Sequence, residues 1–153
     1  MNSAPARSEL FDAALVQCHR ITAGDTVRLA VVRPPTSPTD FSVSFEIWDP
    51  DGAQPPNTHP SSTETFWFLR GEGVAVSDGV ETPVSAGQFL VLPAGSVHHI
   101  RNTGSGRLYA ITMMMPDLGF AELITNGPAA TLDEADIAVL QQSALPPVGS
   151  DER

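Results

Sequence analysis

Two short stretches of this 153-residue chain carry side chains that can bind a metal ion or transfer a proton. The first runs from Asn57 to Glu64 and includes His59, and the second contains the adjacent pair His98 and His99. Imidazole is the commonest side-chain metal ligand, and both imidazole and carboxylate groups serve as general acids and bases. What these groups can do together depends on which of them share a face of the fold.

Strand alternation separates the two adjacent histidines. If a strand begins near Val97, His98 and Ile100 point to one face, whereas Val97 and His99 point to the other. We therefore expect His98 to take part in a site, and His99 to be a surface or packing residue.

Alternation also groups the residues of the first stretch. Asn57 and His59 are two residues apart and are expected to share a face, and Glu64 is expected to share a face with Phe66 and Phe68. This arrangement places an acid beside two aromatic rings.

The second stretch has a turn that positions His98. A short apolar strand over 89–92 is stopped by proline, and a glycine supplies the backbone freedom that a tight reversal needs. The segment fits the pattern G-x5-P-x-G-x2-H-x3-N, which is similar to the second motif of the cupin superfamily. The five fixed positions are Gly87, Pro93, Gly95, His98 and Asn102.

The first stretch resembles the first cupin motif, G-x5-H-x-H-x3,4-E-x6-G. It carries the second histidine as His59, the glutamate as Glu64 and the closing glycine as Gly71. Two positions differ from the pattern, because Asn57 replaces the first histidine and the opening glycine is one place out, at Gly52.

This resemblance implies an all-β fold, a small jelly-roll or double-stranded β-helix barrel with a short C-terminal helix. It also implies one divalent metal ion held by His59, Glu64 and His98, with iron as the first choice and zinc, nickel or manganese as alternatives. Asn57 is expected near the site, where its neutral amide would bond a water or the substrate. Unpaired buried polar groups cost roughly 1–3 kcal/mol each, which favours a bound metal over the alternative, a metal-free pocket.

The expected pocket beside the metal is partly apolar. We expect Phe66, Phe68, Ile100 and Ile47 to line it, which would suit a small, partly apolar substrate. Similarity to flavonol and thiol dioxygenase cupins implies a non-haem dioxygenase-type oxidoreductase in which Glu64 is the catalytic base. The alternatives are a metal-dependent isomerase or lyase, and a cupin that binds a small molecule without turnover.

Short strands separated by turns must position these residues, because 14 prolines and 12 glycines punctuate short apolar runs. The segment 41–48 alternates most clearly, with Phe45 and Ile47 on the expected core face. Glu46 lies on the other face, and we expect it to meet solvent in preference to a barrel mouth.

A capping box at Thr131 and Glu134 predicts a C-terminal helix that ends near Ser143. The predicted plan is a flexible leader over 1–9, a single cupin domain over 10–145 with its barrel over 26–115 and a helical segment over 117–143, and a polar tail over 146–153.

Composition limits the partners. Eighteen acidic and eight basic residues give a formal charge of −10, which opposes binding to nucleic acid and to anionic membranes. No apolar run approaches the roughly 20 residues of a membrane span, and the single Cys18 is typical of a reducing compartment, so we expect a cytoplasmic protein. The outward-facing Trp67 and Leu69 need cover, which predicts a homodimer.

Overall fold

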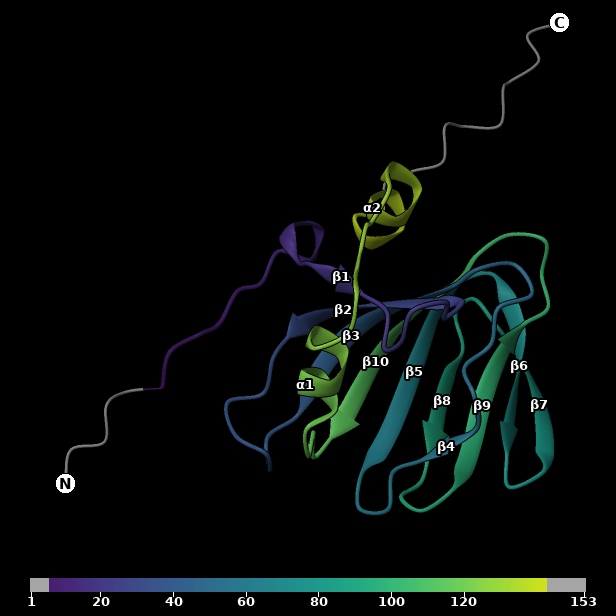
Figure 1. Cartoon of the computed structure of the whole chain (residues 1–153), viewed down its shortest axis with the longest axis horizontal. Coiled ribbons are helices and arrows are strands. Elements are labelled where there is room, and N and C mark those ends of the chain that lie inside the picture. Colours follow the sequence, from purple (N-terminus) through teal and green to yellow (C-terminus); the bar gives the residue numbers. More distant parts are fainter. Residues whose placement is uncertain (1–5, 143–153) are drawn as a thin grey trace, which may run out of the picture.

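The computed structural model describes residues 6–142, which form two antiparallel sheets and three short helical segments. The sheets face each other across a common interior, with β9, β6 and β7 lying opposite the larger sheet (Figure 1). The predicted all-β jelly-roll barrel with a short C-terminal helix is confirmed. Its division into leader, domain and tail stays a prediction, and residues 1–5 and the predicted tail over 146–153 lie outside the described residues.

The larger sheet has the strand order β11-β1-β2-β3-β10-β5-β8, and the smaller sheet has the order β4-β9-β6-β7. The larger sheet is made of β1 (Cys18–His19), β2 (Val27–Arg33), β3 (Ser42–Trp48), β5 (Thr63–Arg70), β8 (Phe89–Leu92), β10 (Leu108–Met115) and β11 (Ala129–Ala130). The smaller sheet is made of β4 (Asn57–Thr58), β6 (Glu72–Ser77), β7 (Val80–Ser85) and β9 (Val97–Asn102). The helical segments are the 3-10 turn η1 (Ala13–Leu15) and the helices α1 (Phe120–Thr125) and α2 (Glu134–Leu140).

The interior between the sheets is filled by a large apolar cluster. Trp48, Phe66 and Phe68 form its aromatic centre, with ring centroids 6.1 Å apart in each successive pair. Ile100 contributes from the opposite sheet and is fully buried. Because these rings pack against one another, they close this part of the interior and leave open space only beyond it.

The outer face of the larger sheet is also buried, which corrects two predictions about β3. Phe45 and Ile47 pack with Tyr109 and with Val139 of α2 in a second apolar cluster, so Ile47 lies outside the barrel and does not line its pocket. Glu46 points to the interior and is fully buried, so the expectation that it meets solvent is wrong. Helix α2 covers the outer face, and both faces of β3 are therefore core.

The turn between β8 and β9 ties the two motif segments together. Gly95 has a φ of 85°, the left-handed region that glycine accepts most readily, and its N–H donates to the carbonyl oxygen of His59 at 2.9 Å. At the end of β9, the side-chain amide of Asn102 donates to the carbonyl oxygens of Trp48, Asp49 and Gly106. These bonds fix the ends of the strand that carries His98.

The start of α2 differs from the predicted capping box. The helix begins at Glu134 with Asp133 as its N-cap, and the reciprocal capping bonds join Asp133 and Asp136 in place of Thr131 and Glu134. The carbonyl of Thr131 instead accepts a hydrogen bond from Arg28, which holds this segment against β2 before the helix starts. Across residues 6–142, no helix is long and apolar enough to cross a membrane.

Candidate metal centre

Three side chains from separate segments meet at one point between the sheets. His59 follows β4, Glu64 lies on β5 and His98 lies on β9. The Nε2 atoms of His98 and His59 lie 2.9 Å and 3.3 Å from the same carboxylate oxygen, Oε2 of Glu64. One ligand atom from each residue lies within 4.8 Å of the others, so the three could hold a single ion. His99 lies on the opposite face of β9, paired with Val76, and is not part of this group.

The orientation of His98 is set by Ser96, which precedes it by two residues on the same face of the chain. The Ser96 hydroxyl donates to the carbonyl of Pro93 at 2.9 Å, so its oxygen is free to accept the N–H of His98 Nδ1 at 3.2 Å. In this assigned tautomer, Nε2 carries a lone pair that points at Glu64. Two lone pairs 2.9 Å apart repel each other unless a proton or a cation lies between them.

The carboxyl of Glu64 is buried but favours its charged form. Burial alone would raise its pKa, but hydrogen bonds and charge interactions with His59 and His98 outweigh that effect and hold the pKa of Glu64 below its usual range. An ionised carboxylate beside two imidazoles is the donor set that divalent transition metals prefer. The residues present therefore fit a metal ion.

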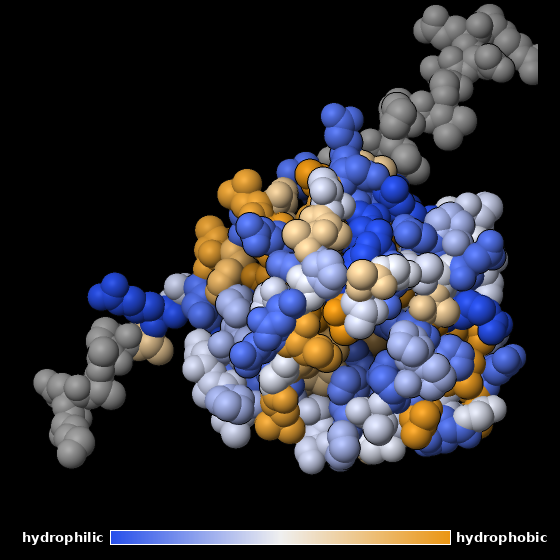
Figure 2. All heavy atoms as spheres, in the orientation of Figure 1, coloured by the Kyte–Doolittle hydropathy of each residue, from blue (hydrophilic) through white to orange (hydrophobic). Residues whose placement is uncertain are grey.

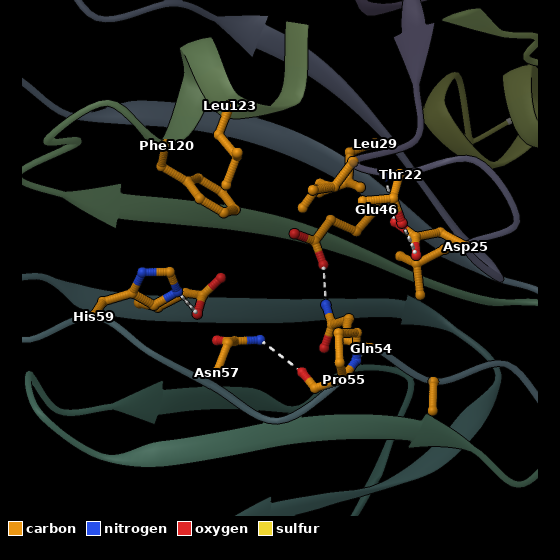
Figure 3. A pocket seen from close by; sticks show the side chains of 14 residues that line it. Thr22, Asp25, Leu29, Glu46, Gln54, Pro55, Asn57, His59, Phe120 and Leu123 are labelled. Atoms are coloured by element: carbon orange, nitrogen blue, oxygen red, sulfur yellow. Dashed lines mark hydrogen bonds and ion pairs between the residues drawn. The ribbon is translucent and has the colours of Figure 1, made fainter. Parts of the chain in front are cut away.

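Asn57 lies next to His98, with which it pairs between β4 and β9. Its amide nitrogen donates to the carbonyl of Pro55 at 3.1 Å, and its Oδ1 atom is buried without a hydrogen-bond partner. In Figure 3 this oxygen faces the side on which His59 lies. An unpartnered acceptor at this place is suited to bind an ion or an ion-bound water.

A cavity of about 200 Å³ opens beside the three residues. His59, Glu64 and Asn57 form one part of its wall, and Glu46 and Gln54 form another (Figure 3). The rest is largely apolar: Ile21, Val27, Leu29, Ala53, Pro55, Phe120 and Leu123. Apolar surface over α1 continues onto the outside of the molecule (Figure 2).

The cavity wall corrects the predicted pocket. Phe66, Phe68 and Ile100 belong to the packed interior and do not line the cavity, because their mutual packing fills the space around them. Sequence reasoning missed Phe120, whose ring meets the His59 ring edge-on at a centroid distance of 5.4 Å. Strand alternation gives no signal for a residue on a helix that docks from elsewhere in the chain. It does give one for Ser96, which is two residues from His98.

Comparison with known proteins agrees with this architecture. The sequence profile of the cupin domain family matches residues 44–114, the stretch from β3 to β10. The chain is 33% identical over 138 residues to germin-like protein 1-1 of Oryza sativa subsp. japonica. This alignment covers 84% of this chain and 57% of that protein. The chain belongs to the cupin superfamily.

Other cupins show the same relationship over shorter stretches. The oxalate-binding protein of Thermotoga maritima is 32% identical over 57 residues, which are 37% of this chain and 47% of that protein. The chain spans little more than half the length of the germin-like relatives that it matches.

Solved cupin structures share the fold. The crystal structure of a predicted oxalate decarboxylase from Thermotoga maritima superimposes with a TM-score of 0.64 at 20% identity, over 70% of this chain and 98% of that one. A cupin 2 conserved barrel domain protein from Salinispora arenicola gives a TM-score of 0.55 at 23% identity, over 82% and 99%. At these identities the likeness establishes the cupin fold alone.

Proposed function

We propose that this cupin is a mononuclear non-haem dioxygenase-type oxidoreductase that acts on a small, partly apolar molecule. Iron would be held by His59, Glu64 and His98. The observation that carries the proposal is the convergence of two imidazole nitrogens and one carboxylate oxygen within 4.8 Å of one another at the wall of a cavity. Two histidines and one carboxylate are the protein ligands of non-haem iron centres that keep coordination positions open.

The asparagine at position 57, where the usual motif has a histidine, supports a metal ion with open coordination positions. A neutral amide oxygen is a weaker ligand for iron than the imidazole that stands here in the usual motif, so fewer positions are filled by the protein. When bound, a ferrous ion would supply Lewis acidity and open positions for oxygen and substrate. The free Oδ1 of Asn57 would orient a water or a substrate group beside these positions.

The remaining side chains position and move protons. Ser96 holds the His98 ring with Nε2 directed toward the ion, and Phe120 restricts the ring of His59. Both imidazoles contact Oε2 of Glu64, which leaves Oε1 to accept a proton from the substrate. The apolar cavity wall excludes water from the substrate, which strengthens the electrostatic interactions inside the site.

Metal analysis and oxygen uptake test this proposal directly. Tag-free protein is expected to contain one equivalent of iron, or to take up one equivalent of Fe²⁺, by elemental mass spectrometry. The iron-loaded protein is then screened with an oxygen electrode against small phenols, enols and thiols. Oxygen consumption with one of them supports the proposal, whereas turnover of a carbonyl compound without oxygen uptake would assign an isomerase or lyase. A fully metal-loaded protein that binds one of these small molecules tightly but does not convert it would be assigned as a small-molecule-binding cupin.

We also propose that a second copy of the chain covers the free edge at β8. Trp67, Phe89 and Val91 lie side by side there and are 57%, 59% and 53% exposed. Pairing of two β8 strands about a twofold axis would satisfy the free backbone edge and cover these side chains together. The edge of the other sheet, at β7, carries Pro83, which cannot donate to such a pairing.

The dimer is tested by light scattering of the full chain. Wild-type protein is expected at twice the chain mass, and the double variant Trp67→Ser, Phe89→Ser is expected at the chain mass with its metal content unchanged. A monomeric wild type at working concentration would rule out the dimer and leave the metal centre unaffected.

A further inference from the structure

Glu46 is a fully buried acid that the metal centre does not use. It lies on β3, facing the interior, and none of its side chain is exposed to solvent. Its Oε2 atom accepts a hydrogen bond from the Nε2 of Gln54 at 3.0 Å, and its Oε1 atom has no hydrogen-bond partner. A buried polar atom without a partner is unfavourable, so a cavity that contains one is suited to a ligand that supplies the partner.

Gln54 fixes which oxygen of Glu46 is left free. The backbone N–H of Ile100 can only donate, and it donates to Oε1 of Gln54 at 3.3 Å. The amide nitrogen of Gln54 must therefore face Glu46. As a result the second oxygen of Glu46 is directed into the cavity, toward the side on which His59 and Phe120 lie (Figure 3).

The cavity wall is acidic and apolar, and it carries no lysine or arginine side chain among its described residues. Asp25, Glu46 and Glu64 contribute its carboxyl groups. Asp25 is already engaged, since its two oxygens accept hydrogen bonds from the backbone and the hydroxyl of Thr22. Burial and the neighbouring charge of Glu64 raise the pKa of Glu46 well above its usual range, which favours its protonated form. A protonated carboxyl can donate one hydrogen bond and accept others.

We propose that Glu46, held by Gln54, is the specificity-determining group of the cavity and selects a mainly apolar molecule whose end facing Glu46 is uncharged and presents a hydroxyl group to it. The proposal rests on the proposed function, since the other end of the same molecule would lie at the metal centre. It also disfavours rigid dicarboxylates whose second carboxylate would reach Glu46 while the first lies at the metal centre, because that second carboxylate would meet an acid in an apolar wall with no lysine or arginine among its described residues.

Matched benzoates provide the test, because they share one metal-binding carboxylate and an apolar ring. Benzoate, 3-hydroxybenzoate, 4-hydroxybenzoate and terephthalate are titrated by calorimetry into the full chain loaded with Fe²⁺ under argon. We expect one of the two hydroxybenzoates to bind about tenfold more tightly than benzoate, the effect of one satisfied buried hydrogen bond. Terephthalate is expected to bind at least tenfold more weakly than that hydroxybenzoate, because its second carboxylate points away from the metal centre.

Variants of the cavity wall assign the preference to its residue. Glu46→Leu is expected to abolish the preference for the hydroxyl group, and Glu46→Gln, which keeps a hydrogen-bonding group of the same size, is expected to retain most of it. Asp25→Asn is the matched control at another carboxyl of the same cavity and should leave the preference unchanged. Iron stoichiometry is measured in every variant and is expected to stay at one, because neither residue is a metal ligand.

The outcomes separate this inference from the proposed function. An iron-loaded protein that binds all the benzoates equally, binds none of them, or favours terephthalate overturns the role of Glu46 and leaves the metal centre standing. Retention of the hydroxyl preference in Glu46→Leu overturns it as well. A protein that takes up no iron overturns the proposed function, and the inference that rests on it is then also lost.

Discussion

The larger sheet separates two buried acid clusters that differ in how their carboxylates are satisfied. On the outer face, Asp136 of α2 is fully buried and accepts hydrogen bonds from Arg28, Arg107 and Tyr109, as well as from the backbone N–H of Asp133. Each of these partners donates a hydrogen bond to the Asp136 carboxylate, which is fully buried. This cluster anchors the helix to the sheet.

On the inner face, the acids meet groups that can change state. Glu64 faces two imidazoles, which bind protons or metals, and Glu46 keeps one oxygen without a partner beside a cavity. A buried acid whose donors are arginines and backbone groups stabilises the fold. A buried acid whose partners are imidazoles, or are incomplete, is poised to bind something else. Burial alone does not distinguish the two kinds.

The largest effect on stability is expected for Asp136→Ala. Removing this carboxylate leaves Arg28 buried without its partner, and breaking a buried pair in this way costs about 3–5 kcal/mol. The free energy of unfolding is measured by urea denaturation of the metal-free protein. Asp133→Ala is the control, since it removes the N-cap of the same helix and should cost about 1 kcal/mol. Equal losses in the two variants would show that the outer cluster does not anchor α2.

A smaller loss of stability, but a complete loss of metal, is expected for His98→Ala. The variant leaves Glu64 without its closer imidazole, which should cost about 1–3 kcal/mol in the metal-free protein. Metal content by elemental mass spectrometry should fall from one equivalent to a small fraction. His99→Ala removes the neighbouring ring on the opposite face and should retain the metal. Loss of metal in both variants would contradict the assignment of the two faces of β9.

The fold and the meeting of His59, Glu64 and His98 were predictable because two sequence motifs resemble those of cupins, and short-range rules added which side chains share a face. The turn at Pro93 and Gly95 sets the start of β9, so alternation puts His98 and His99 on opposite faces, and the motif resemblance indicates that His98 is the inner one. Alternation likewise puts Glu64 on the same face as Phe66 and Phe68. These assignments to strand faces need only the chain within a few residues of the side chain concerned, whereas the meeting of the three segments came from the motif resemblance.

The cavity wall was not predictable because it depends on segments far apart in the sequence. Both faces of β3 are buried, and alternation cannot tell which face is interior when a helix some 90 residues later covers the other one. Ile47 is therefore buried on the outer face and does not line the cavity, and Glu46 faces the cavity and not solvent. The capping box was displaced for a related reason, since Arg28 from β2 binds both the Thr131 carbonyl and the Asp136 side chain.

The two inner acids are expected to give opposite dependences of stability on pH. The pKa of Glu46 is raised in the folded protein, so the stability that its proton provides is complete below the ordinary value of 4.5 and is lost as pH rises toward the folded value. The pKa of Glu64 is lowered, so its contribution is present above that ordinary value and is lost as pH falls. Glu46→Gln should therefore stabilise the metal-free protein relative to wild type increasingly between pH 5 and pH 8.

Urea denaturation at several pH values measures this difference, with Glu64→Gln as the matched control. The control should destabilise the protein relative to wild type at pH 8, and its deficit should shrink as the pH is lowered toward 4. If the free energy of unfolding relative to wild type changes with pH in the same direction in both variants, the conclusion that Glu46 favours its protonated form and Glu64 its ionised form is wrong.

The smallest effect on stability is expected for Asn57→Ala, because the Asn57 side chain makes only one hydrogen bond among the described residues. Its Oδ1 atom has no partner to lose, and its nitrogen bonds a carbonyl only two residues away. Unfolding of the metal-free protein should change by no more than about 0.5 kcal/mol. Affinity for Fe²⁺ should nevertheless fall on the order of tenfold, as is typical when a group supporting a metal site is removed. A stability loss as large as that of His98→Ala, with metal affinity unchanged, would make Asn57 a structural residue and align it with the outer cluster.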